Sequence, residues 1–254
     1  MTRLRVGLGT CAFVLTIALP AVAQRGPAAA ATSVPPDVIS LACAPAMTYE
    51  APAVSLRISG GQESMRRHSH APGDLVTLNA GTRDGITVGQ EFYTRRLLAS
   101  GEVRVSSTNP GTIRTTGWIR VWAVDEEMSL ATITHACDTV EVGDYLEPFA
   151  LPTVPALSQL TGPPERGNYG LVLSGQDRRT QFGSGDYLTI NRGSSQGVTA
   201  GARFVVYHDK KTPGNFLFQI AEAVAVTVNS DTATLHVLSA IDAISAGDYV
   251  GMRK

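Results

Sequence analysis

The fold is decided by a stretch that occurs twice: GDLVTLNAGT at residues 73–82 and GDYLTINRGS at residues 185–194. The register continues without a gap through paired glycines and ends on Phe92 and Phe204. Downstream, Ala123-Val124 matches Ala225-Val226, and Ala131-Thr132 matches Ala233-Thr234. Matches in the same order over so long a stretch indicate an internal duplication.

Each copy has the pattern of short strands joined by tight turns. Residues 75–78 and 187–190 are rich in β-branched or large apolar side chains, which favour strands. An Asn-x-Gly follows each, and Asn and Gly tolerate the left-handed backbone that many turns require. No stretch after residue 23 keeps a helical period for three turns. We therefore expect an all-β protein of two tandem, small, partly closed barrels. The expected structural turn residues are Asp74, Asn79, Gly81, Gly85, Gly89, Asp186, Asn191, Gly193, Gly197 and Gly201.

Four Gly-Asp pairs, at 73–74, 143–144, 185–186 and 247–248, each precede an apolar strand. Carboxylates could bind a metal ion, but an aspartate can also close a turn by accepting backbone N–H groups. The equivalent positions at strand entries favour the turn, so we expect no metal site here.

The N-terminus has the pattern of an export signal. Arg3 and Arg5 precede the apolar run TCAFVLTIAL (10–19), and Pro20-Ala21-Val22-Ala23 predicts cleavage after Ala23. The run is too short for a membrane-spanning helix, although a retained anchor is the competing interpretation. The sequence predicts an exported protein of the periplasm or cell surface, without a transmembrane anchor after cleavage.

Composition divides the rest of the chain. The predicted parts are a signal peptide (1–23), a flexible lead-in rich in Ala and Pro (24–52), a first β-domain (53–147), a Pro-rich linker (148–167) and a second β-domain (168–254). Cleavage removes two of the 21 basic residues and none of the 22 acidic ones, so 19 remain against 22 and the charge becomes −3. Such a balance favours no nucleic-acid partner.

Two cysteines follow the predicted cleavage site, Cys43 and Cys137. An even count in an oxidising compartment predicts a disulfide that ties the lead-in to the first domain; the alternative is two buried thiols. Cys137 corresponds to Ile241 in the second copy, and a position shared by Cys and Ile is expected to be buried. The first copy also has an extra segment of about ten residues within 97–116, a place for function specific to that domain.

The string from Asp74 to Phe92, with its twin from Asp186 to Phe204, resembles an envelope β-module. It is similar to the C-terminal domain of the flagellar assembly protein FlgT and to the β-domains of the rod-shape protein MreC, and to modules beside LysM peptidoglycan-binding repeats. The resemblance implies a structural or protein-contacting element with no catalytic residue to transfer. The coiled coil and anchor of MreC and the LysM motif are missing from this sequence.

Candidate chemistry is sparse. His68 and His70 alternate and could share a metal ion, but the sequence places no third ligand, so a solvated loop is the other interpretation. His135 and Cys137 are two residues apart, which alone is weak support for a catalytic pair. Trp118 and Trp122 fall on one strand face and could stack on a sugar, although core packing is the favoured interpretation.

The sequence thus predicts a non-enzymatic envelope protein without cofactors that contacts another envelope protein or a cell-wall component. The alternatives are a peptidoglycan- or carbohydrate-binding protein that uses Trp118, Trp122 or Tyr93, and a metal-dependent hydrolase centred on His68 and His70.

Overall fold

The computed structural model describes residues 34–62, 69–98, 105–106, 109–175, 179–211 and 216–254. The predicted signal peptide, the start of the lead-in, His68 and most of the extra loop of the first repeat lie outside these residues. No helix within the described ranges is long and apolar enough to cross a membrane.

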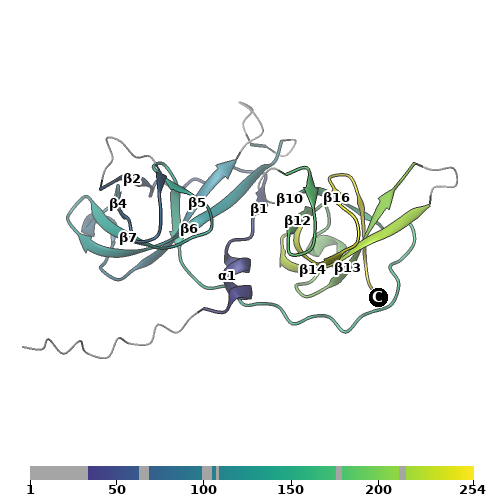
Figure 1. Ribbon diagram of the computed structural model, residues 1–254. Coiled ribbons are helices and arrows are strands. Elements are labelled where there is room, and N and C mark those ends of the chain that lie inside the picture. The colour runs from purple at the N-terminus through teal and green to yellow at the C-terminus, as the bar shows by residue number, and fades with distance from the viewer. Residues whose placement is uncertain (1–33, 63–68, 99–104, 107–108, 176–178, 212–215) are drawn as a thin grey trace, which may run out of the picture. The chain divides into compact units, whose positions relative to one another are not determined.

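The protein is all-β, and the two sequence repeats form the same succession of strands (Figure 1). A short helix and one strand come first: α1 (Pro36–Ala42) and β1 (Ala46–Thr48). The first repeat then contributes β2 (Ile58–Gly61), β3 (Ser69–His70), β4 (Leu75–Leu78), η1 (Thr82–Asp84), β5 (Glu91–Leu98), β6 (Gly111–Val124), β7 (Ser129–Ala136), β8 (Val140–Glu141) and β9 (Tyr145–Pro148). The second contributes β10 (Gly170–Gly175), β11 (Gln181–Phe182), β12 (Tyr187–Ile190), η3 (Ser194–Gln196), β13 (Arg203–Asp209), β14 (Leu217–Val228), β15 (Ala233–Ala240), β16 (Ile244–Ser245) and β17 (Tyr249–Met252).

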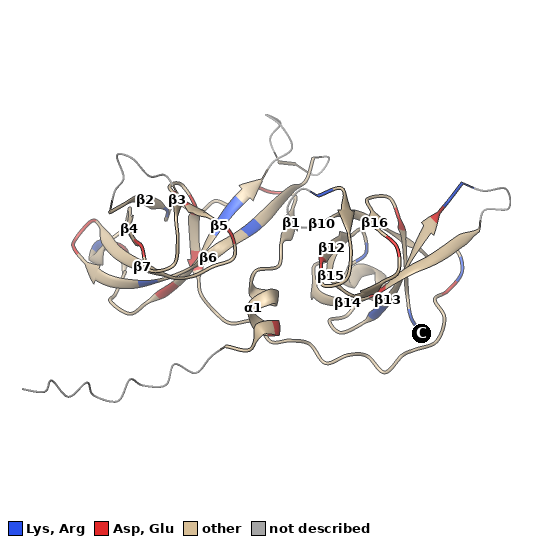
Figure 2. Ribbon diagram, in the orientation of Figure 1, with Lys and Arg blue, Asp and Glu red and all other residues tan. Residues whose placement is uncertain are grey.

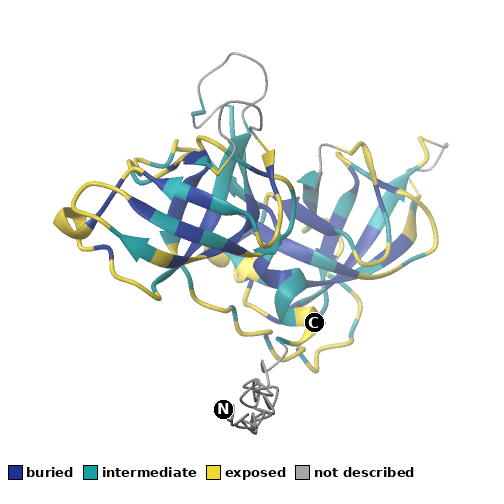
Figure 3. Cartoon of the chain, turned by 60° about the vertical axis from the view of Figure 1, so that its left-hand side comes forward, coloured by how far each residue is buried: buried dark blue, intermediate teal, exposed yellow. Residues whose placement is uncertain are grey.

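The two repeats have the same strand order. The second forms a closed barrel in the order β10-β12-β15-β14-β13-β17, and the first has the matching order β2-β4-β7-β6-β5-β9. A single bridge between Arg57 and Tyr145 joins the two ends of the first sheet. Buried residues alternate with exposed ones along many strands, as in Figure 3, because one face of each sheet lines an apolar interior.

Hydrogen bonds give the true register between the repeats and correct part of the sequence alignment. The Gly89 N–H donates to Val121 O, and the Gly201 N–H donates to Ala225 O, so Val121 is the counterpart of Ala225. The offset is 112 (201 minus 89) before the β5–β6 loop and 104 (225 minus 121) after it, which leaves eight extra residues in the first repeat. The matches of Ala123 to Ala225 and of Ala131 to Ala233 were therefore shifted by two residues.

Composition predicted a flexible lead-in, but part of it is ordered. Its second half forms α1 and then β1, which pairs with β6 from Ala46↔Ile113 to Thr48↔Gly111. The predicted disulfide between Cys43 and Cys137 is present, with the two Cα atoms 5.5 Å apart. Two hydrogen bonds also join the lead-in to the second repeat, one between the Ser40 and Tyr187 hydroxyls (2.9 Å) and one from Thr234 Oγ1 to Pro45 O (3.3 Å).

The segment between β9 and β10 has no helix or strand. Its second half is held to the second repeat, since the Ser158 N–H donates to Gly201 O and the Gly162 N–H donates to Lys254 O, each at 2.8 Å. Its first half has several exposed apolar side chains, among them Leu151, Val154 and Leu157.

Candidate functional site

The four Gly-Asp aspartates all have the same backbone role. In each, a carboxylate oxygen accepts the N–H group of the residue three positions earlier, at distances from 2.8 to 3.0 Å. The preceding glycines all have positive φ, between 86° and 96°, which side chains with a Cβ rarely adopt. The aspartates are Asp74, Asp144, Asp186 and Asp248.

The two asparagines stabilise the barrels in a different way from the one expected. Among the described residues, Lys211 alone has a positive φ without being glycine, so Asn79 and Asn191 do not adopt the left-handed conformation. Instead their side-chain oxygens accept the N–H groups of Arg57 and Leu171, each at 2.7 Å. The amides thus fasten the end of one strand to the start of its neighbour.

Glycine is needed after these asparagines because the backbone passes close by. A Cβ on Gly81 would lie 2.3 Å from Asp125 O, and one on Gly193 would lie 2.4 Å from Asn229 O. Gly85, Gly89, Gly197 and Gly201 have positive φ between 82° and 86°. At these six glycines a side chain would therefore either clash with the backbone or force a strained conformation.

Two of the aspartates also hold a buried ion pair or polar pair that the sequence did not reveal. Asp144 binds Arg96 through Nε (2.7 Å) and Nη2 (3.0 Å) and accepts a hydrogen bond from Thr116 Oγ1 at 2.8 Å. Burial alone lowers the pKa of the Arg96 guanidinium, but the hydrogen bond and charge of Asp144 outweigh it and raise that pKa. In the second repeat His208 replaces Arg96, and its Nδ1 lies 2.6 Å from Asp248 Oδ1. The sequence offered one signal for this equivalence: Arg96 and His208 are 112 residues apart, the same offset as between Gly89 and Gly201.

Of the two histidines, only His70 is described, and it is buried in β3 and does not lie in the solvated loop that the sequence favoured. His68 lies outside the described residues, and His70 is only 5% exposed. The His70 ring packs against Gly61, where a Cβ would come within 2.2 Å of it, and Phe182 packs in the same way against Gly175. His70 therefore takes in the first repeat the packing position that Phe182 takes in the second.

An aromatic cluster lies under the lead-in, on the outer face of the first repeat. Trp118 and Tyr93 are buried beside Ala42, with Ile39 and Phe149 packed against them. The Trp118 ring stacks on His135 with ring centroids 4.1 Å apart. Burial raises the pKa of Tyr93, whose hydroxyl donates to Ala150 O at 2.6 Å.

The expectation that both tryptophans pack in a core is wrong for Trp122, which is 65% exposed. Trp118 lies opposite Tyr93 in the ladder, while Ile119 lies opposite Phe92 and faces the barrel interior. The even spacing therefore directs both tryptophans outward, and the lead-in covers only Trp118. Of the three aromatic residues considered for sugar binding, only Trp122 is exposed.

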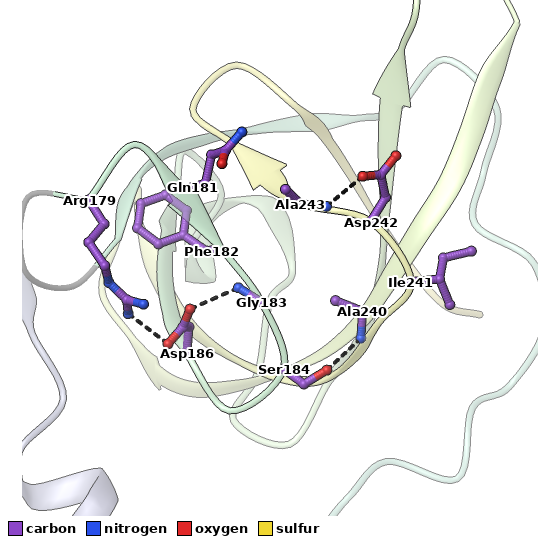
Figure 4. Close-up of a pocket in the computed structure, with 10 residues that line it drawn as sticks. All are labelled: Arg179, Gln181, Phe182, Gly183, Ser184, Asp186, Ala240, Ile241, Asp242 and Ala243. Atoms are coloured by element: carbon purple, nitrogen blue, oxygen red, sulfur yellow. Dashed lines mark hydrogen bonds and ion pairs between the residues drawn. The ribbon is translucent and has the colours of Figure 1, made fainter.

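A shallow depression of about 510 Å³ lies at one end of the second barrel (Figure 4). Its polar side chains bind one another or the local backbone: Arg179 pairs with Asp186 at 2.7 Å, and Ser184 Oγ accepts the Ala240 N–H at 2.8 Å. None of its ten lining residues is a histidine or cysteine. Its lining residues are Arg179, Gln181, Phe182, Gly183, Ser184, Asp186, Ala240, Ile241, Asp242 and Ala243.

Ile241 corrects the expectation that its position is buried, because it is 86% exposed. The equivalence with Cys137 is correct: the Cys137 N–H donates to Thr116 O, and the Ile241 N–H donates to Ile220 O, with the same offset of 104. Cys137 is covered because it is bonded to Cys43 of the lead-in. No such segment covers Ile241 within the described part of the chain.

Three more apolar side chains are exposed in this part of the second repeat. Phe216 is 63% exposed, Phe218 is 44% exposed and Leu238 is 40% exposed. Phe218 precedes by two residues the Ile220 whose carbonyl accepts the Ile241 N–H. We call Phe216, Phe218, Leu238 and Ile241 the apolar rim.

Charged residues of both signs occur on both repeats (Figure 2), and many form surface ion pairs such as Arg83–Glu126 and Arg120–Glu91. Two groups of apolar side chains differ between the repeats: the covered aromatic cluster of the first and the exposed apolar rim of the second. A comparison of the chain with protein-family models and with curated proteins found no match to either.

Proposed function

We propose that this chain is a non-catalytic protein of the cell envelope, whose repeated β-modules contact another envelope protein. The observation that carries the proposal is Ile241, an 86% exposed isoleucine at the position where the first repeat is covered by its own lead-in. Exposed apolar residues that gather in one region are typical of interaction surfaces, whereas single ones are common.

The first repeat shows what such a surface can hold. There the strand β1 pairs with β6 as part of the sheet, and apolar residues of the short helix pack on Tyr93 and Trp118. The second repeat has the same strand order but a free apolar rim, so an apolar segment of a partner is the occupant that fits. The resemblance to protein-contacting envelope modules agrees with this role.

An exported location supports the same proposal. The Cys43–Cys137 disulfide is the kind of bond that persists in oxidising compartments such as the periplasm or the cell surface. The N-terminal export pattern points to the same compartments.

The partner is tested by photo-crosslinking in cells from a reactive residue at position 241, followed by mass analysis of the adduct. We expect one recurring envelope protein that is lost when Phe218→Asp is added. A reactive residue at position 122, which is similarly exposed but lies in the first repeat, is the matched control. Equal crosslinking from both positions, or none from position 241, would overturn the proposal.

A second candidate, binding to peptidoglycan, rests on Trp122. An exposed tryptophan can stack on a sugar ring, and Arg120 and Glu91 form an ion pair on the adjoining strands. Co-sedimentation with purified sacculi that is lost in Trp122→Ala and retained in Ile241→Asp would favour this candidate over a protein partner.

A further inference from the structure

Three side chains with ligand atoms for a soft or borderline metal meet where the lead-in is tied to the first repeat. β7 and the residue after it supply His135 and Cys137, and the end of α1 supplies Cys43. Their ligand atoms all lie within 4.8 Å of one another. We propose that, when the Cys43–Cys137 disulfide is reduced, these three side chains bind one zinc ion and keep the lead-in attached.

The backbone places the ligands at the spacing that zinc requires. Zinc binds sulfur at about 2.3 Å and histidine nitrogen at about 2.0 Å, so two thiolates on one tetrahedral ion lie about 3.8 Å apart. With the two Cα atoms 5.5 Å apart, side-chain rotation can open the sulfurs to that distance. Both backbones stay anchored, since the Cys137 N–H donates to Thr116 O and the Cys43 N–H donates to Ile39 O.

His135 is already oriented by its contact with Trp118. Its ring is held parallel to the Trp118 ring, 4.1 Å away. Within the described part of the chain neither ring nitrogen of His135 has a hydrogen-bond partner, so a metal ion would displace none.

The chemistry balances with a dithiol as reductant. The dithiol supplies two electrons and two protons, becomes a disulfide itself, and converts Cys43 and Cys137 into two thiols. One Zn²⁺ then binds two thiolates and the His135 imidazole, which releases two protons and leaves a fourth position for water. A small-molecule disulfide can reverse the step: it takes up the two electrons of the thiolates and two protons, becomes a dithiol, reforms the protein disulfide and so releases the ion.

Cobalt is the probe, because Co²⁺ takes the zinc geometry and absorbs light. The full chain with Cys11→Ser, which removes the third cysteine, is reduced on an immobilised dithiol and titrated with Co²⁺ without oxygen. We expect one Co²⁺ per chain, a thiolate-to-cobalt charge-transfer band, and displacement of Co²⁺ by Zn²⁺. The oxidised protein should show none of these.

His135→Ala should weaken zinc binding at least about tenfold, since loss of a supporting partner alone costs that much. His236→Ala is the matched control, because the His236 ring also stacks on an aromatic ring, that of Tyr187 at 4.8 Å, but lies in the second repeat. The control should bind as the parent does. Unchanged binding in His135→Ala would overturn the proposal.

The reduced protein must be shown to be folded, and near-ultraviolet dichroism of the tryptophans reports this. If reduction unfolds the first repeat, Cys43→His gives a second test, because it replaces one sulfur by an imidazole and cannot form the disulfide. We expect Cys43→His to bind one Zn²⁺ without any reductant. The proposal is overturned if the reduced protein is folded but binds no stoichiometric metal, or if the Cys43→His variant binds none. The two cysteines would then form a structural disulfide and no metal site.

Discussion

The aspartates of the four Gly-Asp turns share a hydrogen bond but differ in what else they hold. The Asp144 side chain is 1% exposed and faces Arg96, which is 23% exposed. Removal of one member of a buried ion pair leaves the other charge uncompensated, which costs more than the pair contributes. Asp144 is therefore the turn aspartate most important for the stability of the first repeat.

We predict that Asp144→Asn lowers the free energy of unfolding of the first repeat by about 2 kcal/mol, because Arg96 keeps some access to water. Both tryptophans, Trp118 and Trp122, lie in this repeat, so their fluorescence during urea unfolding reports on it alone. Glu91→Gln breaks the exposed pair with Arg120 and should change stability by less than about 0.5 kcal/mol. Equal effects of the two substitutions would contradict the role given to Asp144.

Tyr145 is a buried hydroxyl without a hydrogen-bond partner in the described part of the chain. Its burial, reinforced by the negative charge of Glu147, raises its pKa from 10.0 to about 12. The folded protein therefore holds this proton more tightly than the unfolded chain does. The corresponding stability is fully present below pH 10 and is lost as the pH rises toward 12.

We predict that Tyr145→Phe removes up to about 3 kcal/mol of this alkaline loss and leaves stability near neutral pH unchanged or slightly higher. The measurement is tryptophan-detected urea unfolding at several pH values from 7 to 12. Tyr49→Phe, at a more exposed tyrosine, should leave the alkaline loss as it is. The explanation fails if Tyr145→Phe and the parent lose stability in parallel.

At the scale of elements, the lead-in is the part that composition described least well. The helix α1 has only seven residues, too few for a periodic pattern, and its sequence is rich in residues typical of flexible segments. Its stability comes from the packing of Ile39 and Ala42 on the aromatic cluster and from the disulfide.

We predict that Cys43→Ser with Cys137→Ser lowers the free energy of unfolding of the first repeat by about 4 kcal/mol, because the disulfide closes a long loop. The sequence separation of the two cysteines is 94 residues. In a Trp122→Phe background, Trp118 should also become accessible to acrylamide. Cys11→Ser should change neither quantity, and a Trp118 that stays protected would show that packing alone holds the lead-in.

The strands themselves were predictable because a two-residue alternation and turn glycines are local signals. The pairing register was less so. Register shifts at Thr94/Arg95 in the first repeat and at Val206/Tyr207 in the second lie at equivalent places, and the inserted residues of the β5–β6 loop displaced the alignment after it. Only the hydrogen bonds across the sheet reveal such shifts.

At the scale of the whole molecule, the segment between β9 and β10 is where we expect the two repeats to separate. Leu151, Val154 and Leu157 are 41% to 48% exposed and lie in a segment without helix or strand. From Ser158 onward the chain is hydrogen-bonded to the second repeat, beginning with the Ser158 N–H, which donates to Gly201 O. Cleavage by a protease needs exposed backbone with few hydrogen bonds. In the described part of the chain no backbone N–H of residues 150–157 donates a hydrogen bond, although Ala150 O accepts one from Tyr93.

We predict that thermolysin first cuts the native protein within residues 150–157 and leaves two folded fragments, one for each proposed β-domain. The fragment masses give the site, and the fluorescence maximum of the first fragment and the circular dichroism of both show whether they stay folded. A linker variant with Leu151, Val154 and Leu157 replaced by Gly, Ser and Gly should be cut more slowly, since thermolysin prefers apolar residues. Unfolding of either fragment would show that the repeats depend on each other.

The sequence by itself determined the all-β class, the duplication, the turn glycines and the cysteine pair, because strand alternation, positive φ and disulfide chemistry are set by residues close in sequence or by residue type. The tertiary structure alone decided that Trp118 is covered while Trp122 and Ile241 are exposed, that Arg96 and His208 reach the buried aspartates, and that His135 meets both cysteines. Each of these depends on which segment lies over which strand, and contacts between distant segments leave no periodic trace in the chain.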